Sequence, residues 1–225
     1  MIKGIVFDLD HTLFDRYKTF EEISYKLFED YKDNLLVGRE KFYEIMCEAD
    51  MKKNHYGWKE EDAYARESGI FKEIPEPMSY AEALTGYFHS FAVKYDFVDE
   101  LLIKLRKKYA VALITNGPSD RQRAKLRLLG FEDKFDFIYI SGEHGIHKPE
   151  VYPFEYTAKK LGISPSELLY VGDHPVNDVD ASRRAGYTPV WVKTIPEWQF
   201  DELAHAEYEV DSVKSLPEIL KKLSD

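Results

Sequence analysis

The chain has 225 residues, 44 % of them hydrophobic, which is enough for one substantial core and a smaller second domain. Its formal net charge of −10, from 31 basic and 41 acidic residues, argues against binding to a nucleic-acid polymer or an anionic membrane surface. The single cysteine, Cys47, excludes an intramolecular disulfide, and the sequence shows no signal segment and no apolar run of membrane length. We therefore expect a cytoplasmic protein.

The first predicted strand ends in a pair of acids. Residues 4–7 read as a short buried strand, and Asp8, Asp10 and Thr12 follow it directly. A two-residue spacing on extended backbone places both carboxylates on the same side, at the end of a strand where parallel sheets bind ligands. Two neighbouring carboxylates repel each other, and Mg²⁺ would relieve that repulsion. Taken alone, the pair fits a turn at the end of a strand equally well.

Residues 15–95 carry helical patterns. Apolar side chains recur at helical spacing over 20–31 and 42–49, and Ser79 with Glu82 predicts a capping box before a third helix over 84–91. The region between the second and third helices reads as looser chain. It begins with His55, Tyr56 and Trp58, which could stack on a base or a sugar, or simply pack inside a small helical domain.

Three more predicted strands are each followed by polar residues suited to a phosphate or a metal ion. Residues 110–114 lead into Thr115 and Asn116 at a helix entrance, and residues 135–140 lead into a loop that carries Lys148. Residues 168–171 lead into Asp173 and Asp178. Each piece alone has an ordinary interpretation as a turn, a solvated lysine or an acid at a helix start. Their order along the chain predicts that they converge at one edge of a parallel sheet.

The remaining segments complete the predicted sheet. Residues 188–192 read as a fifth strand, residues 207–210 as a short edge strand, and residues 217–223 as a terminal helix that packs on the core.

Four segments, DLDHTLFD, LITNG, HKPE and YVGDHPVNDVDASRRAG, together resemble the motifs of the haloacid dehalogenase-like hydrolase superfamily, in the family's order. The resemblance is strongest to its phosphatase and nucleotidase branch. It implies an α/β fold, with a Rossmann-like, doubly wound parallel sheet core formed by residues 1–14 and 96–225. It also implies an inserted α-helical cap domain formed by residues 15–95.

The resemblance also implies a role for each matching residue. Asp8 matches the nucleophile that forms an aspartyl-phosphate, and Asp10 matches the general acid and base. The phosphate-binding residues would be Thr115, Asn116 and Lys148, with Thr12 and Asp178 as supporting groups. The expected cofactor is Mg²⁺, held by Asp8, by Asp10 through its backbone carbonyl, and by Asp173.

We therefore expect a Mg²⁺-dependent phosphomonoester hydrolase that acts on a small phosphorylated metabolite, such as a nucleotide or a sugar phosphate. Asp10 favours this over a 2-haloacid dehalogenase, because the dehalogenases of the family lack an acid at that position. A phosphate-dependent binding or receiver module without turnover is the non-enzymatic alternative. The sequence leaves the oligomeric state open.

Four histidines lie in or near the motifs. His11 replaces a glycine that is frequent in the family's first motif, and His144, His147 and His174 flank the third and fourth. A transition-metal site built on them is an alternative, but the oxygen ligands of the nearby acids fit Mg²⁺ better.

Overall fold

The structure is a computed structural model of the whole chain. It describes every residue except 57, 195–197, 199, 201, 224 and 225, and only the backbone at the remaining positions of 53–58. The chain forms two compact units, one made of Met1–Arg16 and Val93–Asp225 and the other of Tyr17–Ala92. The role of the second unit as a cap stays a prediction.

The first unit is built on a parallel sheet of six strands in the order β3-β2-β1-β4-β5-β6. The strands are β1 (Gly4–Phe7), β2 (Ala110–Thr115), β3 (Phe137–Ile140), β4 (Leu168–Gly172), β5 (Thr188–Val192) and β6 (Tyr208–Val210). The chain starts in the middle, adds strands on one side and then returns to the other, which is the doubly wound order. The predicted Rossmann-like fold is confirmed, including the edge strand.

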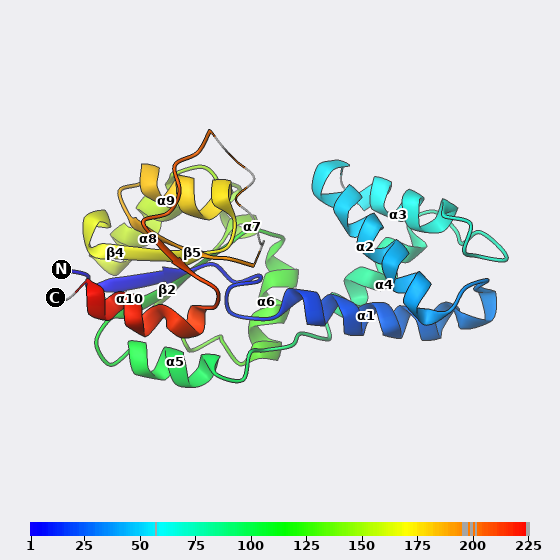
Figure 1. Cartoon of the computed structure of the whole chain (residues 1–225), viewed down its shortest axis with the longest axis horizontal. Coiled ribbons are helices and arrows are strands. Elements are labelled where there is room, and N and C mark those ends of the chain that lie inside the picture. Colours follow the sequence, from blue (N-terminus) through cyan, green and yellow to red (C-terminus); the bar gives the residue numbers. More distant parts are fainter. Residues whose placement is uncertain (57, 195–197, 199, 201, 224–225) are drawn as a thin grey trace. The chain divides into compact units, whose positions relative to one another are not determined.

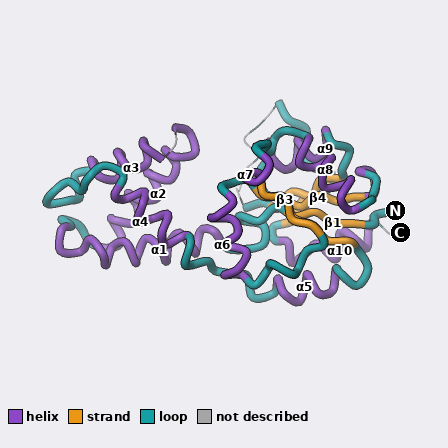
Figure 2. The backbone as a smooth tube through the Cα atoms, turned by 180° about the vertical axis from the view of Figure 1, so that it is seen from behind, coloured by secondary structure: helices purple, strands orange, loops and turns teal. Residues whose placement is uncertain are grey.

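Helices cover both faces of this sheet. In both views, α5 (Val98–Leu105) and α10 (Leu216–Lys222) lie on one face, while α8 (Tyr152–Leu161) and α9 (Ala181–Arg184) lie on the other (Figures 1 and 2). The central strand is therefore buried from both sides, and Ile5, Val6 and Phe7 have no exposed surface. Of two more helices, α6 (Ser119–Leu129) follows β2 after residues 116–118, and α7 (Ser141–His144) follows β3 directly. One π-helical segment, Pro175–Asp180, leads into α9.

Among the described residues, the α-helices of the second unit are α1 (Arg16–Tyr31), α2 (Arg39–Tyr56), α3 (Trp58–Glu67) and α4 (Ser79–Phe88). Its core contains the apolar side chains whose spacing predicts helices, among them Phe20, Ile23, Leu27, Phe42 and Met46. The region predicted to be looser chain contains α3, so that prediction is wrong for residues 58–67.

The predicted capping box at Ser79 is also wrong, because Ser79 is the first residue of α4 and not its cap. The capping group is the carboxylate of Asp62 on α3. It accepts hydrogen bonds from the backbone amides of Met78, Tyr80 and Ala81 at 2.7, 3.1 and 3.2 Å. An acid that is remote in sequence thus satisfies the first amides of the helix.

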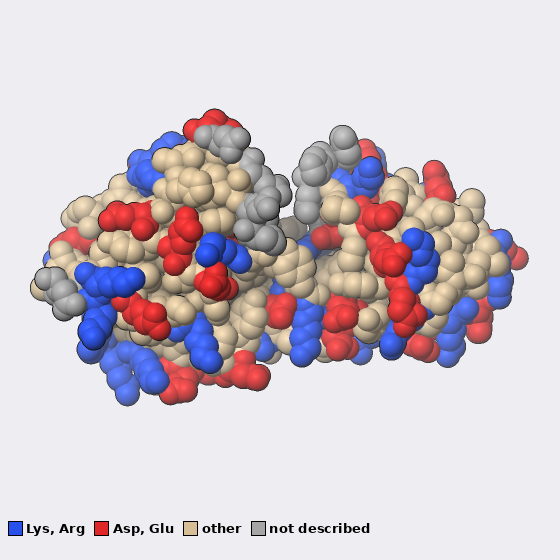
Figure 3. All heavy atoms as spheres, viewed as in Figure 1, with Lys and Arg blue, Asp and Glu red and all other residues tan. Residues whose placement is uncertain are grey.

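Charged side chains of both signs are interspersed over the face shown in Figure 3. Every helix in the described part of the chain is too short or too polar to serve as a membrane span.

Candidate active site

The acid pair lies where β1 ends. The Asp8 amide donates a hydrogen bond to the carbonyl of Val171 on β4 at 2.9 Å, which continues the parallel ladder by one residue. The chain then turns back, and the Leu13 amide donates to the Leu9 carbonyl at 3.0 Å. His11 takes a left-handed conformation in this turn, with φ of 64°. The side chain of Thr12, two residues after Asp10, is buried.

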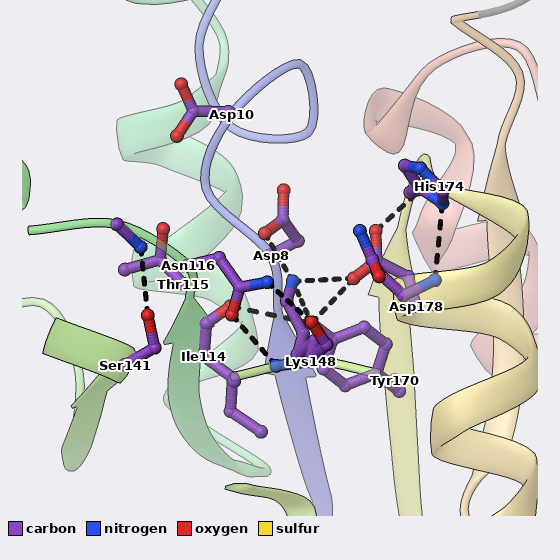
Figure 4. A network of polar contacts seen from close by, with 12 residues as sticks. Asp8, Asp10, Ile114, Thr115, Asn116, Ser141, Lys148, Tyr170, His174 and Asp178 are labelled. Carbon is purple, nitrogen blue, oxygen red and sulfur yellow. Dashed lines mark hydrogen bonds and ion pairs between the residues drawn. The ribbon is translucent and has the colours of Figure 1, made fainter. Parts of the chain in front are cut away.

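Lys148 is the centre of the polar network drawn in Figure 4. Its Nζ lies 2.7 Å from Asp8 Oδ1, 2.6 Å from Asp178 Oδ1 and 2.9 Å from the Tyr170 hydroxyl. An ammonium group has three N–H donors, and these three acceptors use them all. Burial disfavours the charged form, but the charges of Asp178 and Asp8 outweigh it and raise the pKa of Lys148. Lys148 is therefore a fixed cation beside Asp8.

The side chain of Asn116 makes hydrogen bonds to both the carbonyl and the amide of the Lys148 backbone. Its Nδ2 donates to the Lys148 carbonyl at 2.8 Å, and its Oδ1 accepts from the Lys148 amide at 2.9 Å. The side-chain amide of Asn116 is thus engaged with Lys148. The side chain of Thr115 is also engaged, because its hydroxyl accepts a hydrogen bond from Gln122.

Three carboxylates gather beside Lys148. Asp8, Asp173 and Asp178 each offer one oxygen, and these oxygens all lie within 4.8 Å of one another. Burial, with the charges of Asp178 and Asp10, raises the pKa of Asp8 to about 7 against the opposing charge of Lys148. Burial and the charges of Asp178 and Asp8 likewise raise the pKa of Asp173. Clustered oxygen donors of this kind suit a hard divalent cation such as Mg²⁺.

The backbone around β4 allows this approach of the acids. A Cβ on Gly172 would lie 2.5 Å from Asp178 Cγ, so only glycine leaves room for the Asp178 side chain. The His174 amide donates to Asp178 Oδ2 at 2.9 Å, and Thr194 donates its hydroxyl to Asp173 Oδ2 at 2.9 Å. Asp178, a supporting residue by sequence, lies inside the acidic cluster.

The carboxylate of Asp10 is not part of this cluster and turns toward α6 (Figure 4). Lys125 Nζ lies 2.6 Å from its Oδ1, and Gln122 Nε2 lies 3.3 Å from its Oδ2. Burial opposes ionisation, but the charge and hydrogen bond of Lys125, with smaller effects from Arg16 and Gln122, lower the pKa of Asp10 to about 2.

The histidines near the motifs have local partners. His174 Nδ1 accepts from the amides of Val176 and Asn177, His147 Nδ1 lies 2.8 Å from Ser141 Oγ, and the His144 ring stacks on Tyr139. Among the residues that the structure describes, the cluster suited to a metal ion contains carboxylates alone. The side chains of His55, Tyr56 and Trp58 lie outside the described residues, so their predicted contact with substrate stays a prediction.

Several residues of the site were missed by sequence reasoning: Tyr170, Gln122, Lys125 and Ser141. Ser141 accepts a hydrogen bond from the Gly117 amide at 2.9 Å and so ties the second motif to the end of β3. Gln122 and Lys125 could have been identified from the sequence, because their helical spacing places them on the buried face of α6, where apolar residues are expected.

A family model described as haloacid dehalogenase-like hydrolase matches residues 5–192. The chain belongs to the haloacid dehalogenase-like hydrolases. This hydrolase is 27 % identical over 250 residues to the glyceraldehyde 3-phosphate phosphatase of Methanopyrus kandleri, covering 100 % of this chain and 99 % of that one. It is also 27 % identical over 241 residues to the N-acylneuraminate-9-phosphatase of Mus musculus, covering 99 % and 95 %.

Solved structures of this family share the fold. The hydrolase YfnB from Bacillus subtilis, bound to magnesium, matches with a TM-score of 0.80 at 21 % identity, over 97 % of this chain and 98 % of that one. A 2-haloacid dehalogenase from Pseudomonas syringae matches with a TM-score of 0.63 at 26 % identity, over 99 % and 100 %. The chain is thus a hydrolase of this family, and both of the full-length relatives named above are phosphatases.

Proposed function

We propose that the chain is a Mg²⁺-dependent hydrolase of small phosphomonoesters that works through phosphorylation of Asp8. The observation that carries the proposal is the environment of Asp8, where a buried lysine lies 2.7 Å from one carboxylate oxygen and two more carboxylates lie nearby. A nucleophilic carboxylate needs this combination, because the lysine balances charge on one side and the acids can hold a cation on the other.

In the proposed reaction an oxygen of Asp8 attacks phosphorus, and the bond between phosphorus and the leaving oxygen breaks. Asp10 is ionised in the free site because its pKa is low. It therefore first takes up a proton from the monoanion of the bound ester and then gives it to that oxygen, and the product leaves as an alcohol. Water then attacks the phosphorus of the aspartyl-phosphate while Asp10 takes its proton, and Asp8 is released with inorganic phosphate. Proton transfer of this kind contributes about 10²–10⁴-fold to the rate.

We propose that the phosphate side of the site is formed by Lys148, Thr115 and Asn116. Lys148 would balance the charge of the phosphoryl oxygens, while Asn116 keeps Lys148 in place. The groups proposed to hold Mg²⁺ are Asp8, the Asp10 carbonyl and Asp173, with Asp178 beside them. When bound, the ion would supply the positive charge that lets a phosphate dianion approach carboxylates.

The substrate is proposed to be a small phosphorylated metabolite such as a sugar phosphate or a nucleotide. The names of the two full-length relatives, phosphatases for glyceraldehyde 3-phosphate and N-acylneuraminate 9-phosphate, support a small phosphate ester. The helical insertion, predicted at 15–95 and compact over Tyr17–Ala92, is proposed as a cap that selects the leaving group.

The direct test is release of phosphate from a panel of nucleotides, sugar phosphates and phosphoglycolate, with Mg²⁺ and with EDTA. Turnover should require Mg²⁺ and should be lost in Asp8→Asn. The matched control is Asp211→Asn, which removes an exposed acid of the same unit and should leave the rates unchanged. Phosphate release that needs no metal and survives Asp8→Asn would overturn the proposal.

The likeness to the Pseudomonas syringae enzyme makes 2-haloacid dehalogenation the second candidate. It predicts halide release from 2-chloropropionate without added metal, and no phosphate release from the panel. The non-enzymatic receiver alternative predicts a phosphate that stays on Asp8 without turnover. Trp58→Ala tests the cap separately, because a substrate contact should change the relative rates across the panel.

A further inference from the structure

Two polar side chains of α6 contact the carboxylate of Asp10. Lys125 and Gln122 stand three positions apart on the helix and so share a face. Both residues are buried, with 6 % and 1 % of their surface exposed. A buried lysine and a buried glutamine need partners, and the helix brings both to one carboxylate.

Gln122 connects this carboxylate to the neighbouring strand. Its Nε2 contacts Asp10 Oδ2 at 3.3 Å and also donates to the hydroxyl of Thr115, the last residue of β2. An amide nitrogen carries two hydrogens, so one group makes both contacts. The loop after β1 and the end of β2 are therefore tied together through α6.

The two oxygens of Asp10 are held unequally. Oδ1 accepts a short hydrogen bond of 2.6 Å from the Lys125 ammonium, whereas the contact of Oδ2 among the described residues is the longer one to Gln122, at 3.3 Å. Charge-assisted bonds are the stronger kind, so Oδ1 is fixed and Oδ2 is the more available oxygen. An ionised carboxylate oxygen offers about two lone-pair sites, which leaves room at Oδ2 for a proton.

We propose that Lys125 and Gln122 are positioning residues that orient Asp10 so that Oδ2 exchanges the proton in both steps. The inference rests on the proposed function, in which Asp10 is the general acid and base. In the first step the proton passes from Oδ2 to the ester oxygen as its bond to phosphorus breaks. In the second, Oδ2 takes a proton from the attacking water.

The competing explanation is that Lys125 only neutralises Asp10 and supports the fold. The dependence of the rate on the leaving group separates the two. Glycerol 2-phosphate has a poor leaving group that needs a proton, whereas p-nitrophenyl phosphate releases a stable anion that does not. A group that acts through the general acid should therefore affect kcat/KM for the first ester far more than for the second.

The experiment measures kcat/KM for both esters in Lys125→Met and Gln122→Met. We expect a loss of about 10–100-fold with glycerol 2-phosphate, because small misplacement of a reacting group is costly, and a change of less than about threefold with p-nitrophenyl phosphate. In an Asp10→Asn background, Lys125→Met should add less than about a further twofold, because residues that act as a unit are not additive.

The same set of variants includes controls for loss of folding. Lys125→Met leaves the partly buried Asp10 without its cation, so this variant alone could fold poorly. Gln122→Met keeps the ion pair, and the double variant Asp10→Asn/Lys125→Met removes both charges. Lys104→Met, which breaks an exposed pair with Glu100 on α5, is the matched lysine control and should leave both rates unchanged. Circular dichroism and thermal unfolding check each protein.

Equal losses for the two esters in Lys125→Met and Gln122→Met, or additive losses in the Asp10→Asn background, would assign these residues a structural role and overturn the inference. The proposed function fails in a different way. If Asp10→Asn itself lowers kcat/KM equally for both esters, Asp10 is not the general acid, and the inference falls with that assignment.

Discussion

Raising the pH from about 4 to about 7 should destabilise the metal-free protein, because the folded state holds a proton on Asp8 over this range. The pKa of Asp8 is raised from 3.8 to about 7, chiefly by burial. Between these two values the folded chain keeps a proton that the unfolded chain has released. Because the folded state binds more protons, the free energy of unfolding falls as the pH rises through this window.

The size of the effect follows from the shift. A difference of about three pKa units corresponds to about 4 kcal/mol, at about 1.4 kcal/mol for each unit. Asp173 acts in the same direction, because burial also raises its pKa. Asp10 acts in the opposite direction, but its pKa is lowered from 3.8 to about 2, so its stabilising effect is lost only at lower pH.

The assay is urea unfolding in EDTA at about pH 5 and about pH 7.5, for the natural protein and Asp8→Asn. This interval spans about two of the three pKa units, so the expected difference is about 3 kcal/mol. The asparagine variant carries no charge to bury, so it should lose most of the pH dependence that Asp8 causes. Comparing the two proteins cancels the contributions of other titrating groups. Mg²⁺ should stabilise the natural protein more at the higher pH, because the ligands must be deprotonated.

The same pH dependence in Asp8→Asn as in the natural protein would refute this reasoning, because the effect would then come from other groups. Asp211→Asn is again the control. Its exposed carboxylate should leave the pH dependence unchanged.

Three further substitutions test other contacts of the site. Lys148→Met should destabilise the protein by about 3–5 kcal/mol in urea unfolding, because it leaves buried Asp8 and Asp178 without their cation, and should nearly abolish phosphate release. His11→Gly should raise the stability by up to about 1 kcal/mol in thermal unfolding, because glycine takes the left-handed conformation without strain; a lower melting temperature would contradict this. Gly172→Ala should cost about 1–3 kcal/mol and lower activity by displacing Asp178; natural rates would contradict it.

The sheet could be predicted from sequence because its strands are short apolar runs separated by helices. Helix α3 could not, because its buried positions include Glu61 and Asp62 instead of apolar residues. Asp62 is buried because its carboxylate caps α4 and pairs with Arg66 at 2.7 Å. A helix with acids on its inner face lacks the apolar periodicity on which the prediction depends.

The members of the site could be predicted largely from their positions after the strands, but their partners could not. Tyr170 reads as one more apolar strand residue, and only the packing of β4 beside β1 shows that its hydroxyl contacts Lys148. The sequence predicts Asn116 at the phosphate but does not reveal that its amide is bonded to the Lys148 backbone. Such contacts depend on side-chain direction across elements that are distant in sequence.

The pair of bonds between Asn116 and the Lys148 backbone has a consequence for how this enzyme tolerates change. Lys148 is carried by a loop, yet its position is set by the residue that follows β2, 32 positions earlier. The two hydrogen bonds between Asn116 and Lys148 close the chain between these residues into a loop. Its outer turns can therefore gain or lose residues, as surface loops commonly do, without carrying the ammonium group away from the sheet.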